Sequence, residues 1–130
     1  MSALDELIAG LEAGDVDRAL GSLQDDTVLR VAVHAQPFVG RETIGFIFNE
    51  LFSGIFTDLH VREVLSDGLR RVAVFGVGVI DYPEPAEGLI LITVDEQDEL
   101  REVTVFLRPL DALQSLADEM GRRLGGPRPQ

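Results

Sequence analysis

The sequence has 130 residues, of which 45% are hydrophobic and 26% are charged. This composition is typical of one globular domain with a single core and excludes a disordered chain. The 11 basic and 23 acidic side chains give a formal charge of −12. Because a field of this sign repels phosphate groups, we expect neither nucleic acid nor a membrane surface as a partner, whereas small neutral ligands remain open.

Cysteine is absent, which rules out disulfides, thiolate catalysis and cysteine-ligated zinc. The first ten residues hold no basic residue ahead of a long apolar run, and no window approaches roughly 18 uninterrupted apolar residues, so neither a secretory signal nor a membrane span is expected. The sequence therefore predicts a cytoplasmic protein with one domain over residues 1–124. Residues 125–130 contain no apolar side chain and predict a flexible tail.

Hydrophobic periodicity predicts two helices at the start of the chain. Leu4, Leu7, Ile8 and Leu11 have the spacing of one helix face, with Ser2 as the N-cap. Gly14 ends this helix, and a second one follows over residues 16–23. Residues 27–35 then predict a strand, residues 36–40 break it, and residues 41–54 predict a strong amphipathic helix.

Four more strands are predicted over residues 57–65, 70–80, 89–94 and 100–107. Turns join them at residues 66–68, 81–88 and 95–99, and a closing helix follows Pro109. Consecutive hairpins predict an antiparallel sheet. Helices grouped ahead of the strands predict an α+β fold with those helices packed on one face.

The central strands predict a second covering layer. An antiparallel sheet with helices on one side should alternate apolar and polar residues, but residues 72–80 and 89–94 are apolar on both faces. The commonest cover for the second face is another copy of the chain, so we expect a homodimer through the outer sheet face. The alternative is a sheet that curls enough to cover itself. Gly76 and Gly78, two apart in mid-strand, indicate a bend, a bulge or a close approach, and the bend is the simplest interpretation.

The order of elements, together with PFVGRETIGFIF at residues 37–48 and ELREVTVFLRPLDALQSL at residues 99–116, resembles the SnoaL-like proteins of the nuclear transport factor 2-like superfamily. The resemblance covers about residues 3–120, and its most telling parts are Gly40-Arg41-Glu42 and the spacing of Leu100, Val103 and Phe106. It implies a cone-shaped α+β barrel, in which a curled antiparallel sheet wraps around N-terminal helices and encloses a conical cavity. It also implies, frequently, a dimer through the outer sheet face.

This superfamily includes ketosteroid isomerase, limonene epoxide hydrolase and polyketide cyclases, beside members without known activity, so the resemblance predicts the fold more sharply than the function. Its enzymes usually place an aspartate or an Asp/Arg/Asp group in the cavity, and SnoaL-type cyclases carry theirs on a late strand. Here that strand offers Thr104, Phe106 and Arg108, with Glu102 only at its start. No Arg-x-Asp occurs in a predicted strand. These departures disfavour cyclase and epoxide hydrolase chemistry.

Two residues remain as catalytic candidates. His34 ends a predicted strand, where a neutral imidazole can act as a base or bind a ligand, or can simply lie at the rim. Asp81 closes an apolar strand, where an apolar cavity would favour proton transfer near neutral pH, but aspartate is also common in turns. Tyr82 is a candidate donor to a ligand oxygen or a packing residue. Arg108 is a candidate anchor for an anionic ligand group or a surface ion-pair partner.

No metal or cofactor is expected, because the two histidines lack a carboxylate pattern and Gly-Val-Gly at 76–78 lacks the strand-to-helix context of a dinucleotide loop. The leading hypothesis is a dimeric protein with a pocket for a small apolar or polycyclic molecule, with isomerase, cyclase or hydrolase activity open. The predicted lining is Val31, Val33, Phe38, Phe48, Phe52, Phe75 and Phe106. The alternative is a non-catalytic dimerisation or ligand-binding module whose core fills the cavity.

Overall fold

The computed structural model describes residues 2–124, so the predicted tail at 125–130 lies outside the described residues. The helices are α1 (Ala3–Ala13), α2 (Val16–Ala19), α3 (Arg41–Glu50) and α4 (Leu110–Leu124), and a π-helical turn, η1 (Leu51–Ile55), extends α3. The strands are β1 (Leu23–Arg30), β2 (Phe38–Val39), β3 (Phe56–Asp67), β4 (Arg70–Val79), β5 (Tyr82–Val94) and β6 (Leu100–Arg108). None of the helices described is long and apolar enough to cross a membrane.

The described strands form one six-stranded sheet in the order β2-β1-β6-β5-β4-β3. Strands β3 to β6 pair as consecutive antiparallel hairpins, as predicted. The expectation of a wholly antiparallel sheet is wrong at one place, because β1 pairs with β6 in parallel. A tight hairpin makes two successive strands antiparallel, but β1 and β6 are not successive in the chain. β1 precedes α3 and pairs with β6, the last strand.

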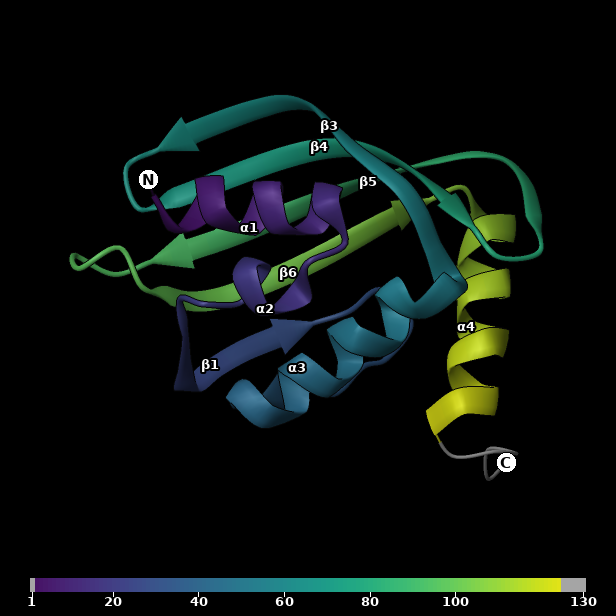
Figure 1. The fold of residues 1–130 in the computed structure, drawn as a ribbon, viewed down its shortest axis with the longest axis horizontal. Coiled ribbons are helices and arrows are strands. Elements are labelled where there is room, and N and C mark those ends of the chain that lie inside the picture. The colour runs from purple at the N-terminus through teal and green to yellow at the C-terminus, as the bar shows by residue number, and fades with distance from the viewer. Residues whose placement is uncertain (1, 125–130) are drawn as a thin grey trace.

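The sheet is curled and unclosed, and α1, α2 and α3 lie over one of its faces, whereas α4 lies across one end (Figure 1). We call the face toward α1–α3 the inner face and the opposite one the outer face. The end of the sheet where β6 runs into α4 is called the α4 end; here α4 contacts β4, β5, β6 and η1. This arrangement is the predicted α+β cone.

The largest differences from the predicted strand boundaries lie in β1 and β5. β1 begins at Leu23 and not at residue 27. β1 ends at Arg30 and not at residue 35, because the chain turns back so that Phe38 and Val39 can pair with Leu29 and Val28. β5 begins at Tyr82, so most of the predicted turn at 81–88 is strand paired with β4. Pro83 and Pro85 are tolerated there because the pairing of β5 with β6 begins only at Glu87.

The core lies between the inner face and the helices. Alternate residues of β4, β5 and β6 are buried there, among them Phe75, Ile90, Ile92 and Val103, against Leu7, Ile44 and Phe48 of the helices. Local predictions at the start of the chain are confirmed: Ser2 and Asp5 form a capping box on α1, and Gly14 ends α1 in the left-handed region. The second helix is shorter than predicted and ends at Ala19.

Candidate ligand site at the α4 end

A group of half-buried apolar side chains gathers toward the α4 end of the core. Some lie at or just after the carboxyl ends of β1, β4 and β6. Others lie in β2, at the start of β5, or on the helices that pack there. The residues are Val31, Val33, Phe38, Phe52, Ile80, Tyr82, Val105 and Leu113. Ile8 on α1 and Val61 on β3 are the other half-buried apolar residues packed against the core. The α4 end is therefore where most of the half-buried apolar surface of the core gathers.

The predicted phenylalanines on the helical side lie together. Phe48 is buried, and its ring centroid lies 6.4 Å from that of Phe52, which in turn lies 5.8 Å from that of Phe56. The helix loses regular geometry at Phe52, Ser53 and Gly54, and Gly54 adopts a φ of 101°. This break ends the helix and turns the chain into β3, with Phe52 left half-buried at the α4 end.

Phe75 and Phe106, predicted to line one pocket, face opposite sides of the sheet. Phe75 is buried on the inner face, where it lies over Gly88: a Cβ at Gly88 would come 2.3 Å from the Phe75 ring. Phe106 pairs with Leu89 on the outer face and is 44% exposed. Val103, Val105 and Leu107 form the inward set of β6, whereas Phe106 shares its face with Glu102, Thr104 and Arg108. This alternation is the sequence signal that places Phe106 on the outer face.

His34 lies in the loop after β1 and is exposed to solvent. Its Nδ1 donates to the Gln36 carbonyl oxygen over 2.9 Å, and its ring lies 5.0 Å from that of Phe38 at an angle of 31°. The hydrogen bond holds the ring against Phe38. This placement matches the rim position named as the alternative for His34.

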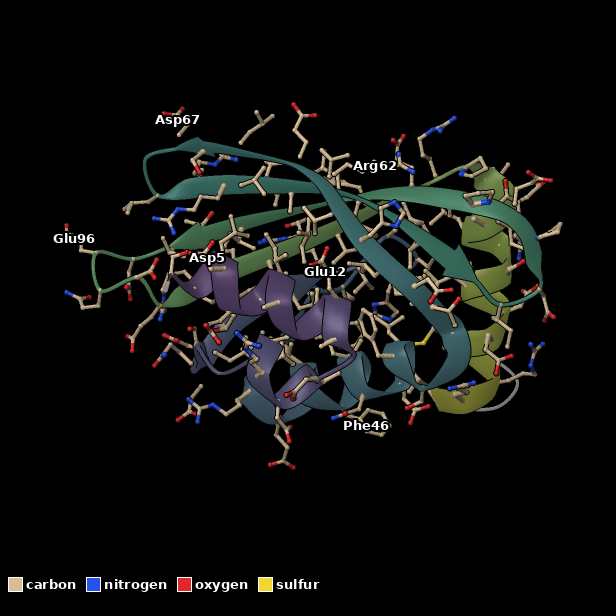
Figure 2. The ribbon with its side chains drawn as sticks, turned by 45° about the horizontal axis from the view of Figure 1, so that its top comes forward. Asp5, Glu12, Phe46, Arg62, Asp67 and Glu96 are labelled. Carbon is tan, nitrogen blue, oxygen red and sulfur yellow. The ribbon has the colours of Figure 1, made fainter. Side chains whose placement is uncertain are left out.

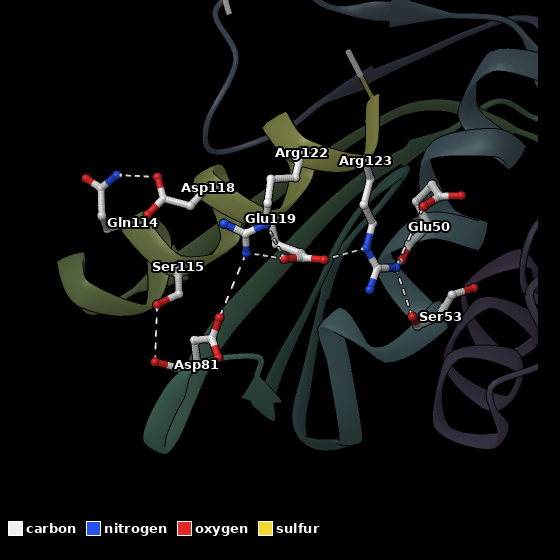
Figure 3. Close-up of polar contacts among 9 residues, drawn as sticks. All are labelled: Glu50, Ser53, Asp81, Gln114, Ser115, Asp118, Glu119, Arg122 and Arg123. Carbon is white, nitrogen blue, oxygen red and sulfur yellow. Dashed lines mark hydrogen bonds and ion pairs between the residues drawn. The ribbon is translucent and has the colours of Figure 1, made fainter. Parts of the chain in front are cut away.

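Asp81 lies in the turn between β4 and β5, with a φ of 61° and a side chain that is 72% exposed. Its carboxylate lies 3.9 Å from the Arg122 guanidinium, and its carbonyl oxygen accepts from Ser115 Oγ over 3.5 Å (Figure 3). Asp81 thus joins the turn to α4. The neighbouring Tyr82 is half-buried at the start of β5, and Arg108 is 71% exposed and lies 3.5 Å from Glu87.

A polar network on α4 was not predicted. Glu119, with a side chain only 13% exposed, accepts hydrogen bonds from Arg123 and Arg122 (Figure 3), and these hold the pKa of its carboxyl below the usual value. Arg123 also donates to the carbonyl oxygens of Glu50 (3.3 Å) and Ser53 (2.9 Å). These bonds satisfy carbonyls left free where α3 becomes irregular. The network fixes α4 to η1, and the charge spacing on α4 was its only trace in the sequence.

The interior of the cone offers little for acid–base chemistry. Among residues 2–124, the one buried polar or charged residue is Thr27, whose hydroxyl donates to the Leu100 carbonyl oxygen (2.7 Å) and accepts from the Gln24 amide (2.8 Å). Within the same residues no group of three histidine or acidic side chains is placed to hold a metal ion. Within the described residues, the inner side of the cone is lined mainly by apolar side chains.

Two hollows of the described surface lie away from the predicted catalytic residues. One, of about 350 Å³, lies between α2 and α3 and is bordered by Leu20, Arg41 and Phe46. The other, of about 250 Å³, lies on the outer sheet face and is bordered by Val74, Leu89 and Phe106. Neither is bordered by His34 or Asp81, so the structure does not join the two predicted catalytic residues in either hollow.

Comparison with solved structures identifies the fold. A crystal structure described as a steroid delta-isomerase from Pseudomonas aeruginosa is 27% identical, with a TM-score of 0.83 over 94% of this chain and 88% of that chain. An uncharacterised protein with a cystatin-like fold from Silicibacter pomeroyi is 20% identical, with a TM-score of 0.84 over 93% and 84% of the two chains. An NTF2-like protein of unknown function from Cytophaga hutchinsonii is 13% identical, with a TM-score of 0.68 over 85% and 91%.

No protein-family model and no curated protein matches this chain. The structural matches nevertheless confirm the resemblance predicted from the sequence: the chain has the fold of the nuclear transport factor 2-like superfamily, to which the SnoaL-like proteins belong. The similar structures include isomerases, cyclase-like enzymes and proteins of unknown function, so the comparison leads to a class of fold with several activities.

Proposed function

We propose that this protein binds a small apolar or polycyclic molecule at the α4 end of the cone and does so without acid–base catalysis. The observation that carries the proposal is the make-up of the interior, where Thr27 is the sole buried polar residue among residues 2–124 and its hydroxyl is already bonded. A proton-transfer reaction in the cone would need a titratable group within reach of the ligand. Apolar ligand binding needs only apolar surface to cover, at about 25 cal/mol per Å².

The half-buried side chains at the α4 end would form the contact surface. Phe52 from η1, Val105 from β6 and Leu113 from α4 come from three elements that converge there. Tyr82 would supply a hydroxyl at the edge of this surface. Such a site, mostly apolar with a few polar groups at its margin, is the usual character of a small-molecule site.

A thermal-shift screen tests the proposal directly. Wild-type protein is heated with a steroid, a terpenoid epoxide and an aromatic polyketide, each over a range of concentrations. A ligand present at 100 times its dissociation constant should stabilise the protein by about 2.7 kcal/mol, and Tm should rise further with ligand concentration. If no apolar compound raises Tm up to its solubility limit, the proposal fails.

Two phenylalanines provide a matched pair of variants for any ligand that binds. Phe52→Ala removes a ring at the α4 end, and Phe46→Ala removes one from the exposed side of α3. We expect Phe52→Ala to raise the Kd by tenfold or more, and Phe46→Ala to leave it unchanged. Equal effects of the two variants would place the ligand away from the α4 end.

Isomerase activity is the second candidate function, and the 27% identity to the steroid delta-isomerase structure is what favours it. Wild-type protein should be assayed for steroid isomerisation beside the Asp81→Asn and His34→Ala variants. The binding proposal predicts no turnover by any of the three. Turnover that falls in either variant would replace the binding proposal with an enzyme that uses that residue.

A further inference from the structure

We call the hollow of about 350 Å³ between α2 and α3 the α2–α3 hollow. Its volume lies in the range of small-molecule sites, and none of the residues that border it belongs to the group at the α4 end. Val16 and Leu20 are buried there and supply apolar surface. Phe46 is 53% exposed at its border, where the ring projects outward from α3 (Figure 2). The hollow therefore offers apolar and aromatic contacts to a ligand outside the cone.

One side of α3 forms a wall of this hollow. Arg41, Gly45 and Asn49 follow one another at intervals of four residues, so they lie on the same side of the helix, and all three border the hollow. The side with Ile44 and Ile47 is buried in the core. No atom lies within 4 Å of a Cβ added at Gly45, so no close contact within residues 2–124 requires glycine there. Because glycine inside a helix is less stable than alanine, a molecule that lies against the α3 backbone would account for this residue.

Two carboxylates border the hollow from opposite walls, Asp17 on α2 and Glu42 on α3. Among residues 2–124, neither side chain has an ion-pair or hydrogen-bond partner. Asn49 Nδ2 donates to the Gly45 carbonyl oxygen over 2.9 Å, which leaves the Asn49 amide oxygen as a third acceptor. These polar groups of the hollow all accept hydrogen bonds, so they fit a ligand that donates.

The arginines next to these carboxylates in the sequence are bound to other groups of the chain. Arg18 donates to Glu6 on α1 over 2.9 Å, and Arg41 donates to the Leu23 carbonyl oxygen over 2.6 Å. Residues 2–50, which include α1 to α3, hold nine acidic and three basic side chains. The field of this net negative charge attracts cations to the helical side of the molecule and repels anions.

We propose that the α2–α3 hollow binds a small organic ammonium ion with an aromatic body. The ammonium group lies between Asp17 and Glu42, and its three N–H donors match the two carboxylates and the Asn49 amide oxygen. The aromatic body lies against Leu20 and the open α3 backbone at Gly45. This inference does not rest on the proposed binding at the α4 end, because the two sites share no residue.

Fluorescence anisotropy with three indole compounds tests the site. Tryptamine carries the ammonium group, tryptophol has a hydroxyl in its place, and indole-3-acetate is an anion. The protein contains no tryptophan, so the indole signal comes from the added compound alone. Wild-type protein should bind tryptamine about tenfold more tightly than tryptophol at low salt, and the difference should shrink at high salt. Indole-3-acetate should bind more weakly than either.

A double variant, Asp17→Asn with Glu42→Gln, removes both charges of the hollow and keeps the side-chain shapes. It should raise the Kd of tryptamine about tenfold and leave that of tryptophol unchanged. Glu84→Gln with Glu96→Gln is the matched control, because it makes the same change in net charge at exposed positions. Figure 2 shows Glu96 far from Phe46, which borders the hollow. The control should leave the Kd of tryptamine unchanged.

Gly45→Ala provides an independent variant that cannot act by unfolding the protein. Its methyl group enters the hollow and should raise the Kd of both tryptamine and tryptophol about fivefold, although alanine stabilises the helix. Phe52→Ala, at the α4 end, should leave the Kd of tryptamine unchanged. The proposal is overturned if tryptamine binds no more tightly than tryptophol, if the double variant and its control have equal effects, or if Phe52→Ala weakens tryptamine binding and Gly45→Ala does not.

Discussion

The two faces of the sheet are built from similar apolar residues but have opposite surroundings. On the inner face Ala73, Ile90 and Ile92 are fully covered by helices, and no titratable group of the described chain lies among them. On the outer face Val72, Val74 and Leu91 are only half-buried, between charged residues. Hydrophobic residues alone do not distinguish the covered face from the open one. The charged residues that flank the apolar residues of the outer face do.

The largest expected change in stability comes from truncating a large side chain to alanine on the inner face of β5. The same truncation on the outer face of β5 is the comparison. Ile92→Ala removes a fully buried side chain from the inner face, and Leu91→Ala removes one of equal size from the outer face. Ile92→Ala should lower the free energy of unfolding by about 2–5 kcal/mol, because it leaves a cavity. Leu91→Ala should cost about 1 kcal/mol or less in a monomer.

Urea denaturation is measured in wild type and in a Phe106→Glu background, where a charge on the outer face opposes any association through that face. The two losses should differ by a factor of at least about two. Equal losses would mean that the outer face is packed as tightly as the core, contrary to its half-buried residues. A larger loss for Leu91→Ala in wild-type protein than in Phe106→Glu would show that the outer face is covered in wild type, as the predicted homodimer requires.

An intermediate loss of stability is expected for a substitution at Gly88, which is packed closely on β5. At Gly88 a Cβ would lie 2.3 Å from the Phe75 ring on the inner side and 2.8 Å from the Phe106 carbonyl oxygen. Gly88→Ala should therefore lower the free energy of unfolding by about 1–3 kcal/mol, because ring and backbone must both move. Thermal denaturation measures the change.

Gly45→Ala is the control for this substitution. Gly45 lies within α3, and no atom lies within 4 Å of the place of an added Cβ. Alanine in a helix is favoured over glycine by about 0.5–1 kcal/mol, so this variant should be more stable than wild type. A stable Gly88→Ala variant would contradict the close packing of Phe75 on β5.

Much of the fold could be predicted from the sequence because local patterns are strong there. Ser2, Gly14 and the spacing of Leu4 to Leu11 fix α1, and the hairpin turns near Gly68 and Asp98 fix the pairing of β3 with β4 and of β5 with β6. The parallel pairing of β1 with β6 could not be predicted, since it joins segments about 70 residues apart. No local pattern records such a contact.

The candidate site was harder to predict because both faces of β4 and β5 are apolar. On β6, however, the alternation of Val103, Val105 and Leu107 with polar residues does indicate which face points inward, and Phe106 is the one apolar residue of the outward set. The placement of His34 depended on where β1 ends, which is set by its pairing with Phe38 and Val39. The outer-face interface and the activity of His34 and Asp81 stay predictions.

The smallest expected effect is the pH dependence of stability that Glu119 causes. It tests whether the titratable groups that contribute to stability lie only at the margin of the core. Arg123 and Arg122 hold the pKa of Glu119 below its usual value, so the folded state favours the carboxylate. This contribution to stability is present above about pH 4.3, the pKa of glutamate in an unfolded chain, and is lost as the pH falls through the lowered folded value. Glu119→Gln should therefore be slightly less stable than wild type at neutral pH.

The difference between Glu119→Gln and wild type should shrink as the pH falls below about 4, because the wild-type carboxyl is then protonated as well. Urea midpoints measured across this range give the comparison. Glu84→Gln, at an exposed position of β5, is the control and should follow wild type throughout. A difference that persists at acid pH would mean that Glu119 stabilises α4 by packing and not by its charge. Among residues 2–124 no buried side chain is titratable. A large change in the urea midpoint of wild type near neutral pH would therefore contradict this description of the interior.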